Sequence, residues 1–246
     1  MKRILVVGGA NGIGLSIVKV LTAKTETEKV YIVDKLPLAD EYKEKKIDSY
    51  QFDLTNTDYS IFDQFQNIDS LFITAGFGHL ALFKDIPEEM IASYFYVNSI
   101  AAIRVIKHFY ERLLSTNDFY CGIMVSIAGF MSSPFFSVYG ATKAALRVFI
   151  ESVNVELEKA GSNNRILNVS PGSISGTSFN QGQTNLSQTI PLAEEIVSHL
   201  KNKDDLFIPQ YEEIFKNVLT RYQQDFRAEG RHSYEFKEQS GRIKSK

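Results

Sequence analysis

The stretch "VVGGANGIG", Val6–Gly14, decides the fold, because it joins an apolar run to a cluster of glycines. The run from Ile4 to Val7 is short and rich in β-branched residues, which predicts a buried strand. Glycines at positions 8, 12 and 14 permit a tight turn into a helix, whose N-terminal N–H groups attract a diphosphate. The stretch therefore predicts a dinucleotide-binding βα unit, unless the glycines only serve the tight turn.

A Walker-type phosphate loop is the nearest alternative to this interpretation. Gly9 and Gly14 have its spacing, but the motif requires Lys and then Ser or Thr at the next two positions. The sequence has Leu15 and Ser16 there. The stretch therefore argues against a P-loop NTPase.

Short β-branched runs alternate with helical stretches along the rest of the chain, which is the pattern of βαβ units. The fold class expected is α/β: a single-domain, Rossmann-type doubly wound parallel sheet of about seven strands, flanked by helices, over residues 1–246. The expected strands are Ile4–Val7, Val30–Val33, Ser49–Phe52, Ser70–Thr74, Gly122–Ser126, Ile166–Ser170 and Leu206–Ile208.

The segments between the strands have their own signals. Apolar spacing predicts two long helices, at about 88–114 and 137–159, and a last helix near 211–226. The polar segment 34–53 predicts a stunted crossover helix, and residues 176–188 predict a mobile loop. Residues 229–246 form a polar C-terminal tail that we expect to be frayed or packed on another subunit.

The composition is ordinary for a soluble globular protein, with 44% hydrophobic and 23% charged residues. A net charge of −2 indicates no general attraction to nucleic acid or to a membrane surface. The only cysteine, Cys121, cannot form an internal disulfide, which favours the cytoplasm. We expect no metal site, no nucleic-acid partner and no membrane association.

Asp34 ends the expected second strand, about twenty residues beyond the glycine loop. An acidic residue there accepts hydrogen bonds from the adenosine ribose and repels a 2′-phosphate, which favours NAD over NADP. A solvated strand-end aspartate is the alternative, and the adjacent Lys35 leaves some room for NADP.

A tyrosine precedes a lysine by four residues in three places, namely Tyr31/Lys35, Tyr42/Lys46 and Tyr139/Lys143. On a helix such residues share a face, so the lysine can approach the phenol. A lysine charge about 4 Å away, at an effective dielectric constant near 20, favours the phenolate by roughly 4 kcal/mol, or about 3 pK units. The Tyr139/Lys143 pair could therefore perform general acid/base catalysis.

The glycine spacing and the Tyr139/Lys143 pair together resemble the short-chain dehydrogenase/reductase family. Further family motifs follow in the family's order: "DL" at Asp53–Leu54, "TAG" at Thr74–Gly76, "VN" ending at Asn98, "SIAG" from Ser126, "YGATK" from Tyr139 and "PGSI" from Pro171. The resemblance implies the catalytic residues Asn98, Ser126, Tyr139 and Lys143. It implies cofactor contacts by Gly8, Asn11, Gly12, Ile13, Gly14, Asp34, Asp53, Leu54, Ala75, Gly76, Tyr139, Lys143, Pro171, Gly172 and Ile174.

The resemblance also implies a reaction, in which a hydride passes between a nicotinamide cofactor, with NAD preferred, and a ketone or secondary alcohol. Tyr139 would be the general acid or base, Ser126 would polarise the carbonyl oxygen, and Asn98 would hold a water in a proton relay with Lys143. The two long helices would pack across a two-fold interface in a homodimer or homotetramer.

Three departures from the family pattern, at Val7, Thr74 and Gly176, put support of the cofactor in doubt. Gly176 occupies the position where the family has a threonine, and Ser175 or Thr177 could make the pyrophosphate contact in its place. Two other functions therefore stay open: an NAD(H)-sensing regulatory module without turnover, and an epimerase or dehydratase that retains NAD.

Aromatic and apolar residues, Phe130, Met131, Phe135 and Phe136, lie between Ser126 and Tyr139. They suggest a pocket for a bulky apolar substrate. Core packing under the loop, or a contact between subunits, is the alternative.

Overall fold

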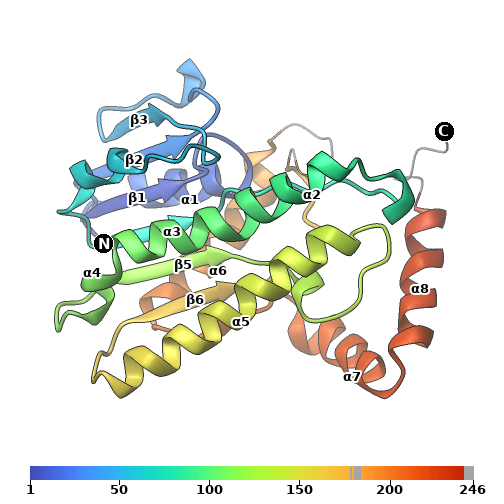
Figure 1. Ribbon diagram of the computed structural model, residues 1–246. Coiled ribbons are helices and arrows are strands. Elements are labelled where there is room, and N and C mark those ends of the chain that lie inside the picture. Colours follow the sequence, from blue (N-terminus) through green and yellow to red (C-terminus); the bar gives the residue numbers. More distant parts are fainter. Residues whose placement is uncertain (178, 180–183, 241–246) are drawn as a thin grey trace.

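The computed structural model describes residues 1–177, 179 and 184–240 (Figure 1). Within these residues, seven strands form one parallel sheet in the order β3-β2-β1-β4-β5-β6-β7. The strands are β1 Arg3–Val7, β2 Lys29–Asp34, β3 Ile47–Gln51, β4 Ser70–Ile73, β5 Tyr120–Met124, β6 Arg165–Val169 and β7 Leu206–Phe207. This order is that of a doubly wound Rossmann-type sheet, which confirms the predicted fold class.

Helices cover both faces of the sheet (Figure 1). They are α1 Gly12–Thr22, α2 Glu88–Phe95, α3 Ala101–His108, α4 Tyr110–Leu114, α5 Ser137–Lys159, α6 Leu186–Lys201, α7 Lys216–Gln224 and α8 Phe226–Gln239. Between β2 and β3 the only helical turn is Asp40–Tyr42, so the expected stunted crossover is confirmed.

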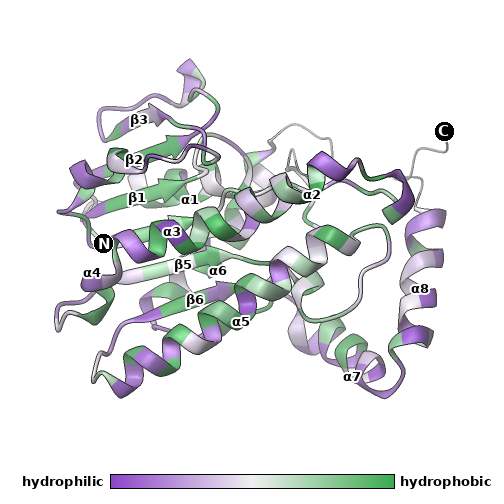
Figure 2. Cartoon of the chain, in the orientation of Figure 1, coloured by the Kyte–Doolittle hydropathy of each residue, from purple (hydrophilic) through white to green (hydrophobic). Residues whose placement is uncertain are grey.

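Two hydrophobic clusters lie on opposite faces of the sheet, because successive side chains of a strand point to opposite sides. In β1, Leu5 and Val7 pack with α3 and α5, whereas Ile4 and Val6 pack with α1 and α6. All four side chains are fully buried. The central strands are accordingly hydrophobic along most of their length (Figure 2).

The long helix expected over 88–114 is not continuous. A π-helical turn, Tyr96–Ile100, separates α2 from α3, and the backbone at Phe109 leaves helical geometry before α4. The π turn places Asn98 where its side chain bonds the backbone of Phe77, a contact between distant segments that helical periodicity does not reveal. The second long helix, α5, has the predicted bounds.

The C-terminal region is more ordered than the sequence indicates. The helix expected near 211–226 is a π turn, Tyr211–Phe215, followed by α7, and most of the expected polar tail belongs to α8. Arg221 bonds Glu229 at 2.6 and 3.2 Å, which ties α7 to α8, and Lys237 bonds the segment before α5 of its own chain. The prediction of a frayed tail is therefore wrong for residues 229–239, while residues 241–246 lie outside the described part.

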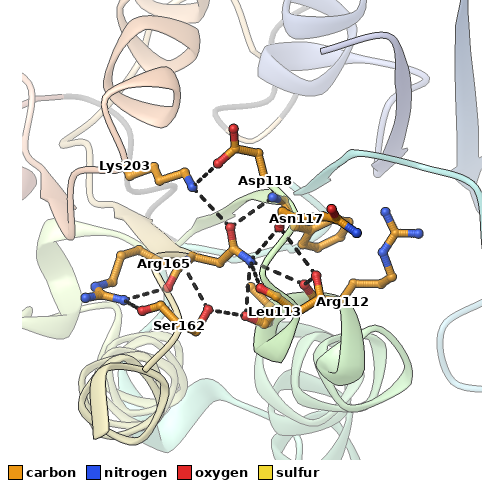
Figure 3. Close-up of polar contacts among 10 residues, drawn as sticks. Arg112, Leu113, Asn117, Asp118, Ser162, Arg165 and Lys203 are labelled. Atoms are coloured by element: carbon orange, nitrogen blue, oxygen red, sulfur yellow. Dashed lines mark hydrogen bonds and ion pairs between the residues drawn. The ribbon is translucent and has the colours of Figure 1, made fainter. Parts of the chain in front are cut away.

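A polar network fixes the end of the sheet where β5 and β6 begin (Figure 3). The buried amide of Asn164 donates to the carbonyls of Leu113, Ser115 and Asn117, at 3.2, 3.0 and 3.0 Å. Its oxygen accepts from the backbone N–H of Phe119 at 2.9 Å. One side chain thus satisfies the backbone groups of the turn between α4 and β5.

Candidate active site

The predicted site residues gather at the carboxyl edge of the sheet. The glycine loop follows β1, Thr74–Gly76 follows β4, and Ser126 and Pro171 follow β5 and β6. The chain changes direction across the sheet between β1 and β4, and in open parallel sheets such a switch point is where ligands bind. The fold therefore places the expected cofactor residues and the expected catalytic residues at one edge of the sheet.

The glycine loop leaves no room for side chains. Gly8 has φ +90°, and a Cβ there would lie 2.4 Å from the backbone nitrogen of Ala75. A Cβ on Gly14 would lie 2.1 Å from the Gly8 carbonyl oxygen. Glycine is thus required at both positions, so that the first turn of α1 can lie against the end of β4.

Thr74, one of the departures from the family pattern, supports this loop directly. Its hydroxyl donates to the carbonyls of Gly8 at 2.9 Å and Val7 at 3.2 Å. The Val7 carbonyl also accepts from the backbone N–H of Ala75 at 3.1 Å. The loss of loop support expected at Thr74 is therefore not what the structure shows.

The loop also carries a backbone donor at the start of α1. The backbone N–H of Gly12, at the start of α1, donates to the hydroxyl oxygen of Thr184 at 2.8 Å, so this donor points to a place where an oxygen fits. Asn11 occupies the N-cap position of α1 with an extended backbone, and its carbonyl accepts from the backbone N–H of Leu15. Ile13 packs on the core. These backbone donors at a helix N-terminus suit the phosphates of a dinucleotide.

Asp34 lies at the end of β2, directly beside the glycine loop. Its carboxylate accepts from the backbone N–H of Ala10 at 2.9 Å and of Leu36 at 3.0 Å. Lys35 is held by the carboxylate of Asp53 at 2.8 Å, and this contact lowers the pKa of Asp53 to about 2. The Leu54 carbonyl accepts from the hydroxyl of Tyr59 at 2.7 Å, which shapes the neighbouring turn.

Asn98 is 1% exposed and lies against the strand end that carries Gly76. Its oxygen accepts from the Phe77 N–H and its nitrogen donates to the Phe77 carbonyl, both at 2.9 Å. The nitrogen also approaches the Thr142 hydroxyl at 3.4 Å. The amide therefore joins the β4 end to α5 at Thr142, within the helical turn that carries Tyr139 and Lys143.

Tyr139 and Lys143 lie on one face of α5, as the spacing predicts, and both are buried. The Lys143 ammonium donates to the Met124 carbonyl at 2.8 Å and lies 5.7 Å from the centre of the Tyr139 ring. Burial lowers the pKa of Lys143 to about 8 and raises that of Tyr139 to about 12. The drop in the Tyr139 pKa expected from the lysine charge is thus absent here, because desolvation of the phenolate outweighs the lowering influence, which comes from Ser126.

Ser126 does not end a strand, since β5 stops at Met124 and Ser126 begins a short 3₁₀ turn, Ile127–Gly129. Its hydroxyl accepts from the Ala128 N–H at 3.1 Å. A hydrogen bond between Ser126 and Tyr139 favours the phenolate and opposes the rise in the pKa of Tyr139. Ser126 therefore lies close enough to Tyr139 to influence its pKa.

The segment after β6 lies at the same edge of the sheet and contacts the turn after β5. The Pro171 carbonyl accepts from the Ile127 N–H at 3.0 Å, a Cβ on Gly172 would lie 2.6 Å from the ring of Phe215, and Ile174 packs on the core. Gly176 adopts φ +73°, which explains a glycine there.

Thr177 is the better replacement for the displaced threonine. Thr177 is buried, whereas Ser175 is exposed. A Cβ added to Gly12 would lie 3.9 Å from the Cβ of Thr177. The loop expected over 176–188 ends early, because α6 begins at Leu186. Residues 178 and 180–183 of that loop lie outside the described part of the chain.

Aromatic rings surround the Tyr139 side chain, but they are only partly the predicted ones. Phe136 lies 5.2 Å and Phe179 5.3 Å from Tyr139 between ring centres. Phe130 lies under Arg147, and Phe135 contacts Tyr234 of α8. Phe179 could not be predicted as part of this group, because its loop has no periodic pattern.

No helix within the described residues is both long and apolar enough to cross a lipid bilayer. Across the same ranges, no group of three or more His, Cys, Asp or Glu side chains is placed to hold a metal ion.

The fold and the site define a class of protein. A family model described as short chain dehydrogenase matches residues 2–187, and the chain belongs to this family.

Individual relatives are distant. An uncharacterised oxidoreductase of Saccharomyces cerevisiae is 24% identical over 188 residues, and the match spans 71% of this chain and 60% of the yeast protein. A short-chain dehydrogenase/reductase of Burkholderia phymatum, solved with NAD, has a TM-score of 0.77 at 15% identity and covers 92% of this chain and 94% of its own. An alcohol dehydrogenase of Thermococcus sibiricus, complexed with 5-hydroxy-NADP, has a TM-score of 0.71 at 18% identity, over 85% and 95%.

Proposed function

We propose that this protein transfers a hydride between NAD(H) and a ketone or secondary alcohol. The observation that carries the proposal is that Ser126, Tyr139 and the buried Lys143 lie at the edge of the sheet that also holds the glycine loop. A nicotinamide cofactor, when bound, supplies or accepts the hydride.

The chain's own residues handle the proton. With a pKa near 12, Tyr139 is neutral at pH 7, which is the form that donates a proton to a carbonyl oxygen during reduction. Ser126 donates a hydrogen bond to the same oxygen and stabilises the charge that develops there. The Lys143 ammonium lies 5.7 Å from the centre of the Tyr139 ring and donates to the Met124 carbonyl, so it forms the cationic side of the proposed site.

The proposed cofactor is NAD rather than NADP. The Asp34 carboxylate lies where a 2′-phosphate would be repelled, and Lys35, the nearest cation in sequence, is engaged by Asp53. The Gly12 N–H and the buried Thr177 lie beside the expected position of the phosphates. The cofactor selectivity rests on these charges and not on the resemblance alone.

Titration of the purified protein with NADH and with NADPH, followed by nicotinamide fluorescence, tests this proposal. We expect micromolar binding of NADH, much weaker binding of NADPH, and loss or inversion of this preference in Asp34→Ala. The matched control is Asp48→Ala, which removes a carboxylate of β3 that pairs with Lys29 of β2. Failure of both cofactors to bind would refute the oxidoreductase proposal.

A screen of carbonyl compounds follows, with Tyr139→Phe as the variant that separates binding from turnover. This variant keeps the ring contacts with Phe136 and Phe179 but has no proton to donate. We expect NADH binding to persist while turnover falls by about a hundredfold or more. Unchanged function in Tyr139→Phe would favour the alternative, an NAD(H)-sensing module without turnover; NAD retained stoichiometrically through purification would favour an epimerase or dehydratase.

The proposed substrate is bulky and apolar, because Phe136 and Phe179 flank Tyr139. Aromatic rings beside the hydroxyls of Tyr139 and Ser126 suit an aryl or branched alkyl ketone better than a small polar one. Equal kcat/KM values for bulky and small polar ketones would contradict this proposal.

We also propose a homodimer or homotetramer in the cytoplasm. Exposed apolar side chains on the outer faces of the helices, Ile100, Val148 and Val155, are 39%, 51% and 56% exposed and support an interface there. A monomer by light scattering at micromolar concentration would refute the assembly. Fractionation of cells followed by immunoblotting tests the location.

A further inference from the structure

Helix α8 lies against the segment Ser132–Phe136, which precedes α5 and carries Phe136 to the Tyr139 ring (Figure 1). The family model ends at residue 187, so α8 belongs to a part of the chain that the family pattern does not describe. What α8 contributes must therefore be inferred from its own contacts.

The first contact concerns a strained residue. Phe135 has φ +66°, in the left-handed region that non-glycine residues rarely adopt. Such a conformation persists only where surrounding contacts hold it. The Phe135 ring lies 4.6 Å from the Tyr234 ring of α8, and its carbonyl accepts from the Ala81 N–H at 3.0 Å.

The second contact is polar. Lys237, one turn of α8 beyond Tyr234, donates to the Ser133 hydroxyl at 2.7 Å and to the Pro134 carbonyl at 2.8 Å. The same ammonium lies 5.5 Å from the centre of the Phe136 ring, within the range of a cation–π attraction. A Cβ on Gly230 would lie 3.5 Å from the Ser132 hydroxyl, so the helix and the segment are in close contact.

Helix α8 is itself well anchored. Asp225 caps it by accepting from the backbone N–H groups of Arg227 and Ala228, at 2.9 and 3.0 Å. Glu229 is 8% exposed, and its carboxylate pairs with Arg221 of α7 through two hydrogen bonds. An anchored helix can hold a strained segment, whereas a frayed tail could not.

We propose that α8 fixes Ser132–Phe136 as the outer wall of the substrate site, with Tyr234 and Lys237 as positioning residues that set the place of Phe136 beside Tyr139. This inference rests on the proposed function for its effect on catalysis. It predicts that damage to α8 weakens binding of the bulky ketone and leaves cofactor binding unchanged.

Two variants test it, Tyr234→Ala and Lys237→Met. For the best bulky ketone we expect KM to rise about tenfold in each, with kcat and the Kd for NADH within about twofold of wild type. Tyr234→Phe keeps the ring and should restore the wild-type KM. Phe236→Ala and Arg231→Met make matched changes at exposed positions of the same helix and serve as controls.

Hydrogen exchange gives a second readout that needs no turnover. The Ala81 N–H bonds Phe135 and the Phe136 N–H bonds Ser133, so we expect both amides to exchange about tenfold faster in Tyr234→Ala and Lys237→Met. Amides in the middle of α5 should not change. Wild-type exchange and wild-type KM in both variants would overturn the proposal. If no variant and no wild-type protein bound NADH, the proposed function would fail, and the exchange rates would still decide whether α8 holds the segment.

Discussion

At the scale of single residues, the ion pair between Lys35 and Asp53 bears on the ribose contact proposed for Asp34. Lys35 lies next to Asp34, the residue expected to reject a 2′-phosphate, and its ammonium is bound by Asp53 at 2.8 Å. The Lys35 side chain is 73% exposed, so water weakens this ion pair. We expect that a Lys35 ammonium released from Asp53 would attract a 2′-phosphate and so favour NADP.

Asp53→Asn should therefore shift cofactor selectivity. We expect the ratio of the Kd for NADPH to the Kd for NADH to fall about three- to tenfold at low ionic strength, as for an exposed charge contact. Fluorescence titrations with both cofactors measure it, and Asp48→Asn is the matched control on β3. An unchanged ratio in a variant that still binds NADH would show that Lys35 has no influence on the 2′ position.

The buried Lys143 makes stability depend on pH. Burial lowers its pKa to about 8, whereas in the unfolded chain it lies near 10.4, so between these values the unfolded state binds more protons and the contribution of Lys143 to stability rises with pH. Lys143→Met should be more stable than wild type at pH 7 by about 1–3 kcal/mol, with the difference shrinking towards pH 10. Urea unfolding at several pH values below 10 measures this.

Staying below pH 10 keeps Tyr139 out of the comparison. Its pKa is raised to about 12 in the folded protein, so its own contribution is lost only as pH rises above about 10. Lys45→Met makes the same change at an exposed lysine. A difference between Lys143→Met and wild type that stays constant with pH would contradict the lowered pKa of Lys143.

At the scale of secondary-structure elements, Asn164 is the strongest candidate for a single side chain that holds two elements together. Its amide satisfies carbonyls after α4, and its oxygen satisfies the N–H that leads into β5. Asn164→Ala should lower the free energy of unfolding by about 2–4 kcal/mol, because several buried backbone groups lose their partner.

Urea unfolding of Asn164→Ala and of Asn163→Ala makes a matched comparison, since Asn163 is the exposed neighbour of the same type. We expect the second variant to lie within about 0.5 kcal/mol of wild type. Equal stability losses in the two would mean that the network around Asn164 does not contribute.

The elements also show what the sequence could predict. Runs such as "ILVV" and "VYIV" locate strands within a residue or two, because β-branched residues favour a buried strand. The π turn at Asn98 and the short turn at Ser126 could not be predicted, since each is fixed by contacts with segments far away in the chain, Phe77 and Pro171. Helix α8 was missed for the same reason: its polar sequence looks like a tail until its contacts are known.

Among the site residues, Tyr139, Lys143 and the glycine loop were predictable, because spacing on one helix or one turn dictates their geometry. The pKa of Tyr139 was not, since it depends on how completely the surrounding aromatic rings exclude water. Roles in catalysis and in cofactor contact stay predictions until the titrations and variants above are measured.

At the scale of the whole molecule, helices α1, α3, α5 and α6 pack on the sheet, whereas α8 contacts α7 and the segment before α5. The single-domain prediction for residues 1–246 therefore becomes an experiment. Heating should give one cooperative transition at the same midpoint by far-UV and near-UV circular dichroism. In a homo-oligomer this midpoint rises with protein concentration. Two separate transitions would show that α7 and α8 unfold as an independent unit.

The burial of Cys121 in β5 offers a way to measure how often the sheet and α8 open. Cys121 is the only thiol in the chain and is fully buried in β5. Because burial also raises its pKa, we expect the thiol not to react with thiol reagents in the folded protein. The rate at which a dye modifies Cys121 would then report how often the sheet itself opens. A cysteine introduced at exposed position 235 would accept a probe without background labelling, so that the motion of α8 could be timed in the same molecule.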